Sequence, residues 1–468
     1  MDKLTFQPLQ YWKGQTQLLR IGLLKRIEEL SVSDYPTASP NQTIRFLQDY
    51  LNELSHAIDN SGTEDELRIL RMQIAQLGVF LDWLDNAHTE QTPRGLVQLL
   101  KHLINLIAPN SRVIARPQAE YNYSIRDLGG FLKSLVDNYI PHSKQSVFQD
   151  YLSSPTKLIS FPRIERDNIL AHAIFGHELG HPIADEYLNQ ETIETGELQK
   201  HIVDFLQQEL NKQNKQLSEG EKLAETTKIF NQVLEVRKRA LQELISDAVG
   251  IIIFGPSAFF ACYELFWGGD LDALPSPREF YPPSRMRIRL MLKLMKDLGF
   301  QQGLLNIKDD RSKNYIDSVK EFLSFCENLT TINTDHQAIN NSPLHKLAYD
   351  SAISSLEKAI KFALAKTTNV AFDGNKIFLQ VPELIKRIEM NIPPNEIGDP
   401  KSPQLVDFRA SLLSAWIYKL RNINPDTNNE LTSSENERLQ KLTLRAIEYV
   451  ILQSEYNEIM HIDNGATL

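Results

Sequence analysis

Residues 177–181 read HELGH, a pattern that allows only a narrow class of local structure. His177 and His181 are four residues apart, so on a helix both imidazoles project from one face and can reach a single ion. Glu178 is rotated by about 100° from His177 and would flank that ion without binding it. With 11 histidines and 60 acidic residues among 468, chance supplies at most about 0.03 such segments. The pattern therefore predicts a helix here with a metal-binding face.

The flanking residues indicate where this helix begins and ends. It is expected to run from about Asn168 to His181, because Pro182 disfavours the α conformation in the residue before it. His172 lies off the face of the two histidines and is expected to be an ordinary packed or capping residue. A second face carries mostly small side chains, which let another backbone come close: Ile169, Ala173, Gly176 and Gly180.

A zinc site with two histidines needs a third protein ligand and leaves its fourth position to water. The best candidate is Glu243, on an apolar helix expected from Leu241 to about Phe254. Asp247 lies four residues further on, where it would accept a hydrogen bond from a ligand histidine and raise its basicity. Taken alone, this pair fits an ordinary exposed helix face. Following HELGH, it predicts one Zn²⁺ ion held by His177, His181 and Glu243, with Asp247 behind the ligands.

The order of HExxH and a later E-x-x-x-D helix resembles the gluzincin metallopeptidases. It is most similar to the family of CaaX prenyl proteases and bacterial heat-shock membrane proteases, which also carry a His-Pro followed by Arg-Ile. Residues 281–288, YPPSRMRI, match the Pro and the pair Arg287-Ile288, but Tyr281 stands in place of the His. The resemblance covers about residues 157–298, and the membrane helices of those relatives are not evident here.

This resemblance implies a zinc-dependent metallopeptidase that acts on a protein or peptide, with Glu178 as the catalytic base. In the family, the His of the third motif helps to hold the substrate or the developing oxyanion. A Tyr281 hydroxyl can also donate a hydrogen bond to an oxyanion, so it either substitutes or the role is lost. Arg287 would brace the site or bind substrate; the alternative is an exposed helix arginine beside Arg285 and Arg289.

Two other classes of function stay open at the level of sequence. A non-catalytic, zinc-stabilised helical protein that binds or regulates a partner would keep the metal ligands but would not need Glu178. A helical interaction scaffold would contain no metal at all. The long helical flanks also allow a sensing or regulatory module that controls a protease.

Composition narrows the environment and the partners. The net charge of −10 argues against a general nucleic-acid binder, which would usually be basic. Cys262 and Cys326 are too few for a thiolate zinc site and fit a reducing cytosol. The N-terminus has no basic region followed by an apolar run, so no signal peptide is expected. These features favour a cytoplasmic protein.

One segment, Ala248–Trp267, has the length of a membrane span and a single charged residue, Glu264. Gly255-Pro256 interrupts it, and acidic residues precede it. We therefore expect a buried helix and its turn, and no membrane span.

The expected fold class is mainly α with a small β element, a zincin-like catalytic core flanked by helical regions. Residues 1–150 form the N-terminal helical region, 151–300 the core and 301–468 the C-terminal helical region. Strand-like patterns occur at 113–125, as a strand or hairpin, and at 157–164, where Pro162 suggests an edge or a strand end. An extended peptide would be able to add to that edge.

Further boundaries follow from caps and from composition. Asn41 and Thr63 stand where helix N-caps are expected, and Glu66 completes a capping box with Thr63. Residues 190–240 are expected to form two solvated helices with a joint near 218–220. A helix is expected over 284–298 and a loop over 424–434.

Overall fold

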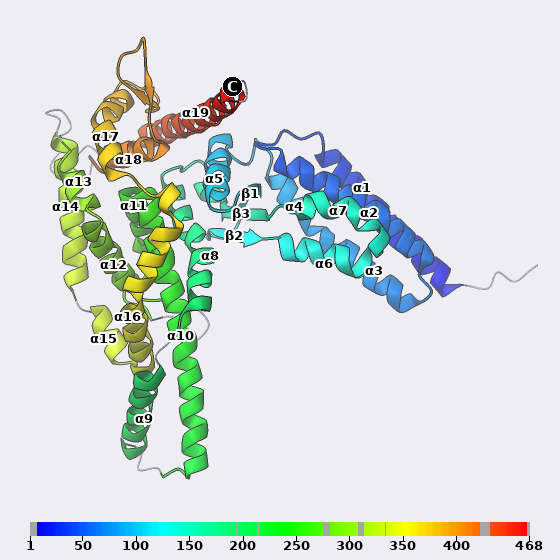
Figure 1. Ribbon diagram of the computed structural model, residues 1–468, viewed down its shortest axis with the longest axis horizontal. Coiled ribbons are helices and arrows are strands. Elements are labelled where there is room, and N and C mark those ends of the chain that lie inside the picture. The colour runs from blue at the N-terminus through cyan, green and yellow to red at the C-terminus, as the bar shows by residue number, and fades with distance from the viewer. Residues whose placement is uncertain are drawn as a thin grey trace, which may run out of the picture. The chain divides into compact units, whose positions relative to one another are not determined.

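The computed structural model describes residues 7–192, 195–212, 216–274, 281–307, 313–332, 334–421 and 431–465. The chain is 75% helical, and its described part contains one three-stranded and one two-stranded sheet, which confirms the prediction of a mainly α fold with a small β element. Packing divides it into two compact units, Met1–Asp167 with Ile451–Leu468, and Asn168–Val450 (Figure 1). The division into three regions at residues 150 and 300 stays a prediction.

The first unit buries one hydrophobic core between its helices and the sheet strands β1 and β3. Its three-stranded sheet contacts α2, α4 and α5. Its elements are α1 (Pro8–Leu30), α2 (Ser39–Asn60), α3 (Glu64–Leu77), α4 (Val79–Asn86), α5 (Arg94–Ile107), β1 (Arg112–Gln118), β2 (Ser124–Asp127), α6 (Gly129–Tyr139), η1 (His142–Lys144), α7 (Ser146–Leu152), β3 (Thr156–Pro162) and η2 (Arg163–Glu165).

The sequence predicts N-caps at Thr63 and Asn41, and the structure confirms only the first. The Thr63 hydroxyl accepts a hydrogen bond from the Glu66 backbone N–H at 3.2 Å, and the Glu66 carboxylate accepts one from the Thr63 N–H, which confirms the capping box. The prediction that Asn41 caps a helix is wrong. Helix α2 already begins at Ser39, because Pro40 is preset for the first helical turn.

The strand order β1-β3-β2 corrects two expectations about the sheet. A strand does lie within 113–125, but β1 and β2 do not pair as a hairpin, because β3 runs between them, parallel to β1 and antiparallel to β2. Strand β3 is therefore central, and Pro162 marks its end. Both of its edges are already hydrogen-bonded, so a peptide cannot add along it as expected.

The second unit is a helical assembly in which α10 packs along both α8 and α16 (Figure 1). Helix α19 (Ser433–Gly465) begins here and ends in the first unit. The remaining elements are η3 (Ala171–Ile174), α8 (Phe175–Gln190), α9 (Thr195–Lys212), α10 (Glu219–Phe254), α11 (Pro256–Trp267), α12 (Ser284–Asp297), α13 (Phe300–Leu305), α14 (Lys313–Thr331), α15 (Thr334–Asn340), α16 (Pro343–Lys366), η4 (Thr368–Val370), α17 (Gly374–Glu389), β4 (Glu396–Ile397), β5 (Gln404–Leu405) and α18 (Phe408–Leu420).

Helix α8 continues past the point where the sequence predicts its end. Pro182 lies inside the helix, which runs on to Gln190. Ile183, Ala184 and Tyr187 are buried beyond the proline, so packing of this face outweighs the local cost of the proline. The start also differs, because a 3₁₀ turn occupies Ala171–Ile174 before α8.

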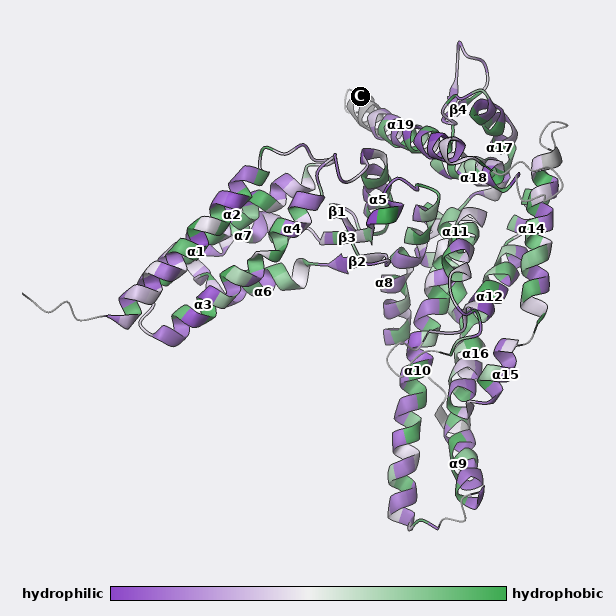
Figure 2. Cartoon of the chain, turned by 180° about the vertical axis from the view of Figure 1, so that it is seen from behind, coloured by the Kyte–Doolittle hydropathy of each residue, from purple (hydrophilic) through white to green (hydrophobic). Residues whose placement is uncertain are grey.

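Helix α10 joins two segments that the sequence separates. The second solvated helix and the apolar helix expected from Leu241 form one continuous helix of 36 residues. Ser218 caps its start, accepting a hydrogen bond from the Glu221 N–H. Figure 2 shows hydrophilic residues along α9 and the neighbouring part of α10, while the end of α10 beside α11 is mainly hydrophobic. Polarity therefore changes along α10 without a break.

The apolar segment 248–267 is a buried helix end and its turn, as predicted. Gly255 has φ +58°, and an added Cβ would lie 2.6 Å from the Phe372 ring, so this turn needs glycine. Pro256 then starts α11. Within the described residues, no helix combines the length and apolarity that crossing a membrane requires. The helix expected over 284–298 is α12, and the loop expected over 424–434 lies mostly outside the described residues.

Helices α8 and α10 touch backbone to backbone, as the small-residue face of α8 predicts. A Cβ on Gly180 would lie 2.5 Å from the Cα of Ser246, and one on Gly176 would lie 2.9 Å from the Cα of Gly250. Both distances are shorter than real carbon contacts, so these glycines set the separation of the two helices.

We therefore expect Gly180→Ala to destabilise the protein by about 1–3 kcal/mol, because the added methyl group forces two backbones apart. Gly220→Ala on α10 is the control, since an added Cβ there meets nothing within 4 Å. The melting temperature should fall for Gly180→Ala and stay level or rise slightly for Gly220→Ala. Equal melting temperatures for Gly180→Ala and wild type would contradict the close packing.

Candidate metal centre

Two helices bring the three predicted ligands together. Helix α8 carries His177 and His181, and α10 carries Glu243. One ligand atom from each lies within 4.8 Å of the others, and in the described part of the chain this is the one group of histidine, cysteine or carboxylate side chains arranged to hold a metal ion. The four-residue spacing and the glycine contact between the helices together produce this convergence.

The donor geometry suits a tetrahedral ion. The Nε2 atom of His177 lies 3.3 Å from Oε2 of Glu243. Two ligands of a zinc ion at about 2.0–2.1 Å are about 3.3–3.4 Å apart in a tetrahedron. The His177 and His181 rings stand 89° apart with centroids 4.8 Å apart, so they approach the centre from different directions. Two imidazoles and one carboxylate are a donor set that Zn²⁺ prefers.

Asp247 and Arg287 form a hydrogen-bonded chain behind the ligand His177. The Nδ1 atom of His177 lies 2.8 Å from Oδ1 of Asp247; the ring donates, since a carboxylate only accepts. Arg287 donates to both oxygens of Asp247, at 2.8 and 2.7 Å, and its guanidinium lies 4.6 Å from the centre of the Phe266 ring. This arrangement fixes the His177 tautomer and leaves Nε2 facing Glu243.

His181 is oriented by a residue that the sequence did not single out. Its Nδ1 atom is hydrogen-bonded to the Ser246 hydroxyl at 3.3 Å, which leaves Nε2 for an ion. Ser246 lies three residues after Glu243 on α10, so helical spacing alone would have identified it as a neighbour.

The charges of the cluster favour a cation. Burial alone would raise the pKa of Asp247, but the charge and hydrogen bonds of Arg287 hold it well below its ordinary value. The pKa of Glu243 is also lowered, because His177 and Arg287 outweigh its burial. Burial would lower the pKa of His177, but the two carboxylates raise it to about 10. The field between His177 and Glu243 therefore stabilises positive charge.

Glu178 stands on the more open side of the centre. Glu178 and His181 are partly exposed, whereas His177 and Glu243 are buried. Burial raises the pKa of Glu178 to about 7, and the charge of Glu243 acts in the same direction. Its carboxylate makes no hydrogen bond within the described residues, so its oxygens are available to a water molecule. Burial, aided by the charge of His177, lowers the pKa of His181 to about 4.

The two remaining predicted residues lie in different surroundings. Arg287 is 8% exposed, so it is not a surface arginine. Of the two expected roles, bracing the site or binding substrate, its hydrogen bonds to Asp247 fit the first. Tyr281 is 49% exposed, and its backbone carbonyl accepts a hydrogen bond from the Tyr349 hydroxyl at 3.2 Å. The role of Tyr281 stays a prediction. His172 is buried, as expected of a packed residue.

Comparison of the chain with protein-family models, with curated proteins and with solved structures gives no match. The local chemistry of the centre is therefore the basis for a function.

Next to the centre, a buried ion pair joins α8, α10 and α16. Arg237 of α10 donates two hydrogen bonds to Glu191, which follows α8, at 2.9 and 2.6 Å. It also donates to the hydroxyls of Ser351 and Ser355 on α16, at 2.9 and 2.8 Å. The two charged side chains are only 2% and 7% exposed.

Arg237 also lines a cleft of about 800 Å³ between α9 and α16. None of the three candidate metal ligands lines this cleft.

This ion pair predicts a specific dependence of stability on pH. Burial would raise the pKa of Glu191, but Arg237 lowers it below its ordinary value of 4.5. The stabilisation is therefore fully present above pH 4.5 and is lost as the pH falls through the lower pKa of the folded state. Urea denaturation should give wild type about 3 kcal/mol more unfolding free energy than Glu191→Gln at neutral pH, and a shrinking difference in acid.

Glu186→Gln on α8 is the matched control. Glu186 pairs with Lys366 at the surface, where an ion pair contributes little, so this variant should follow the wild-type curve. A difference between wild type and Glu191→Gln that does not change with pH would contradict the role of the Glu191 charge.

Proposed function

We propose that this chain is a zinc-dependent metallopeptidase that hydrolyses peptide bonds. The observation that carries the proposal is the convergence of His177, His181 and Glu243 around one point, with Glu178 on the more open side. Structural zinc sites are closed by four protein ligands, whereas catalytic sites keep a position for water or substrate. The centre has three protein ligands, and the Glu178 carboxylate beside them makes no hydrogen bond within the described residues. Both features support a catalytic rather than a structural zinc site.

The chemistry needs only short movements of protons. When bound, Zn²⁺ lowers the pKa of water and polarises a carbonyl group. Glu178 accepts the proton of the attacking water and later donates it to the leaving amine. Asp247 keeps His177 in one tautomer, and Arg287 keeps Asp247 ionised and in place. Arg287 thus acts through Asp247, as a positioning residue and not as a group that touches the substrate.

Tyr281 is the candidate oxyanion donor in this mechanism. Its phenol can donate a hydrogen bond to the oxyanion of the tetrahedral intermediate, the role that a His has in the resembling family. Its exposed side chain supports access to a substrate.

We also propose that the chain is a gluzincin and acts in the cytoplasm on a protein or peptide. Support for the gluzincin assignment is the HExxH helix followed by a second helix that supplies Glu243 and Asp247. Support for the compartment is that Cys262 and Cys326 are both buried and unpaired, as suits a reducing environment.

A zinc-stabilised protein that binds or regulates a partner without catalysis is the second candidate. Tyr281 in place of the expected His favours it. In that case the ion would only tie α8 to α10, and Glu178 would be dispensable.

The variant Glu178→Gln separates the two candidates. We expect it to keep the zinc content of wild type and to lose proteolysis of an unstructured protein library by about 10²–10⁴-fold, because only the proton acceptor is removed. Metal analysis and mass spectrometry of the cleaved library give the two readouts. Glu186→Gln, on an exposed position of the same helix, should match wild type in both.

Equal cleavage by Glu178→Gln and wild type would remove Glu178 as the base. Zinc binding by both proteins with cleavage by neither would favour the non-catalytic candidate. A wild-type protein without affinity for zinc would favour a metal-free helical scaffold.

A further inference from the structure

Helix α12 carries three arginines at alternate positions, Arg285, Arg287 and Arg289. Residues two apart on a helix are separated by about 200°, so Arg287 faces away from the other two. Arg287 reaches Asp247 at the metal centre, whereas Arg285 and Arg289 reach the end of α14 and the start of α15. Neither of the latter two is a freely exposed side chain, since Arg285 is 7% exposed and the Arg289 side chain 29%.

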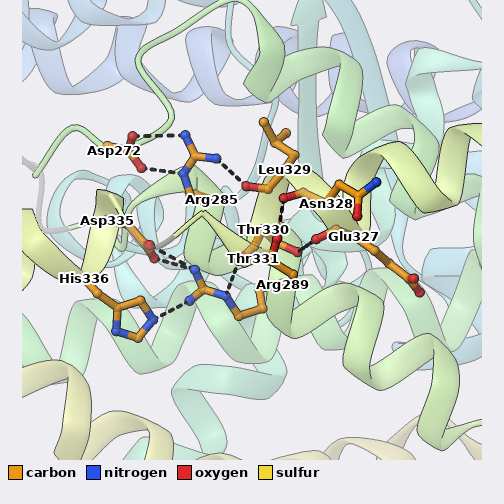
Figure 3. Close-up of polar contacts among 10 residues, drawn as sticks. All are labelled: Asp272, Arg285, Arg289, Glu327, Asn328, Leu329, Thr330, Thr331, Asp335 and His336. Atoms are coloured by element: carbon orange, nitrogen blue, oxygen red, sulfur yellow. Dashed lines mark hydrogen bonds and ion pairs between the residues drawn. The ribbon is translucent and has the colours of Figure 1, made fainter.

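Arg285 holds two segments at once (Figure 3). Its Nε and Nη2 atoms donate to the two oxygens of Asp272, at 2.6 and 3.0 Å. Its Nη1 atom donates to the backbone carbonyl of Leu329 at 2.5 Å. The guanidinium therefore joins the segment after α11 to the last turn of α14.

Arg289 makes a parallel set of contacts one turn further along α12 (Figure 3). Its Nη2 atom lies 2.9 Å from each oxygen of Asp335, whose side chain is fully buried. Its Nε atom donates to the Thr330 carbonyl at 3.1 Å, and its Nη1 atom donates to Nε2 of His336, also at 3.1 Å. All five donor groups of a guanidinium lie in one plane, so these partners restrict its orientation.

The partners on α14 are groups that need a cation. The last carbonyls of a helix have no acceptor role within it and carry its negative end. Leu329 and Thr330 lie in the last turn of α14. The Leu329 carbonyl accepts a hydrogen bond from Arg285, and the Thr330 carbonyl accepts one from Arg289. By contrast, α12 has no side-chain cap at its start, where Pro283 is the capping residue. The two outer arginines thus supply polar contacts that favour one rotation of α12 about its axis.

We propose that Arg285 and Arg289 are positioning residues of the metal centre. By fixing the rotation and height of α12, they hold the Arg287 guanidinium where it meets both oxygens of Asp247, which in turn orients His177. Such a constellation tolerates an error of only about 0.5 Å and 10–20°. The inference rests on the proposed metal site but not on the proposed reaction.

The test is the zinc dissociation constant of the full chain, measured by competition with a chromogenic chelator. We expect Arg287→Ala to raise the constant about 10–100-fold, as loss of an outer partner of a ligand does. Arg289→Lys should raise it less than Arg289→Ala, which should raise it about 10-fold, because lysine keeps the charge beside Asp335 but lacks the separate nitrogens that reach the Thr330 carbonyl and His336. Lys293→Ala is the control, since Lys293 lies one turn after Arg289 on α12 and its side chain is 73% exposed.

The double variant Arg287→Ala/Arg289→Ala separates positioning from general destabilisation. If Arg289 acts through Arg287, the double variant binds zinc as weakly as Arg287→Ala alone. Multiplied effects in the double variant, or wild-type affinity in a folded Arg289→Ala protein, would overturn the proposal. If Arg289→Ala does not fold, Arg289→Lys decides, and its wild-type affinity would overturn the proposal too.

The outcomes for affinity and for activity stay distinct. Absence of zinc binding by wild type would remove this inference together with the metal site. Zinc binding without proteolysis would contradict only the proposed function, because the dissociation constants would still report the effect of Arg289.

Discussion

The contact between α8 and α10 is the constraint on which the rest of the centre depends. Gly176 and Gly180 let the two backbones meet, and the same turns of α8 carry His177 and His181. On α10, the residues that receive this contact alternate with Glu243 and Asp247. A separation of the helices larger by one methyl group would move the carboxylate away from both imidazoles. The close packing of α8 on α10 and the positions of the metal ligands are therefore set by the same turns of these two helices.

Burial of this much charge requires an ordered set of partners. An unpaired carboxylate in the interior would be neutralised by protonation, because desolvation disfavours its charge. Asp247 avoids this through two hydrogen bonds from Arg287 and one from His177. Arg287 also faces Glu243, at 3.5 Å. Glu243, Asp247 and Arg287 thus each have an opposite charge beside them.

The parts of the structure that the sequence predicts well depend on short-range patterns. The capping box at Thr63 and the metal face of α8 involve residues within one turn of each other, where helical spacing fixes the geometry. Pairing HELGH with Glu243 needed a chemical argument, since a zinc ion with two histidines requires a third ligand.

The parts that it predicts poorly depend on partners far along the chain. Strand β3 lies between β1 and β2, an order that no local pattern of 113–125 encodes. The helix continues past Pro182 because Ile183 and Tyr187 gain burial against distant residues. No local pattern indicates the ion pair of Arg289, because its buried partner, Asp335, lies 46 residues later and does not belong to any motif. Long-range burial decides such cases, and sequence periodicity does not report it.

The central claim is that His177, His181 and Glu243 hold one zinc ion. X-ray absorption at the zinc K-edge of the purified protein tests it most directly, because the spectrum reports the ligand atoms themselves. We predict about one zinc per chain, with nitrogen and oxygen ligands at about 2.0–2.2 Å, an imidazole signature from two histidines and no sulfur at about 2.3 Å. A protein without stoichiometric zinc, or a first shell that contains sulfur, would contradict the claim.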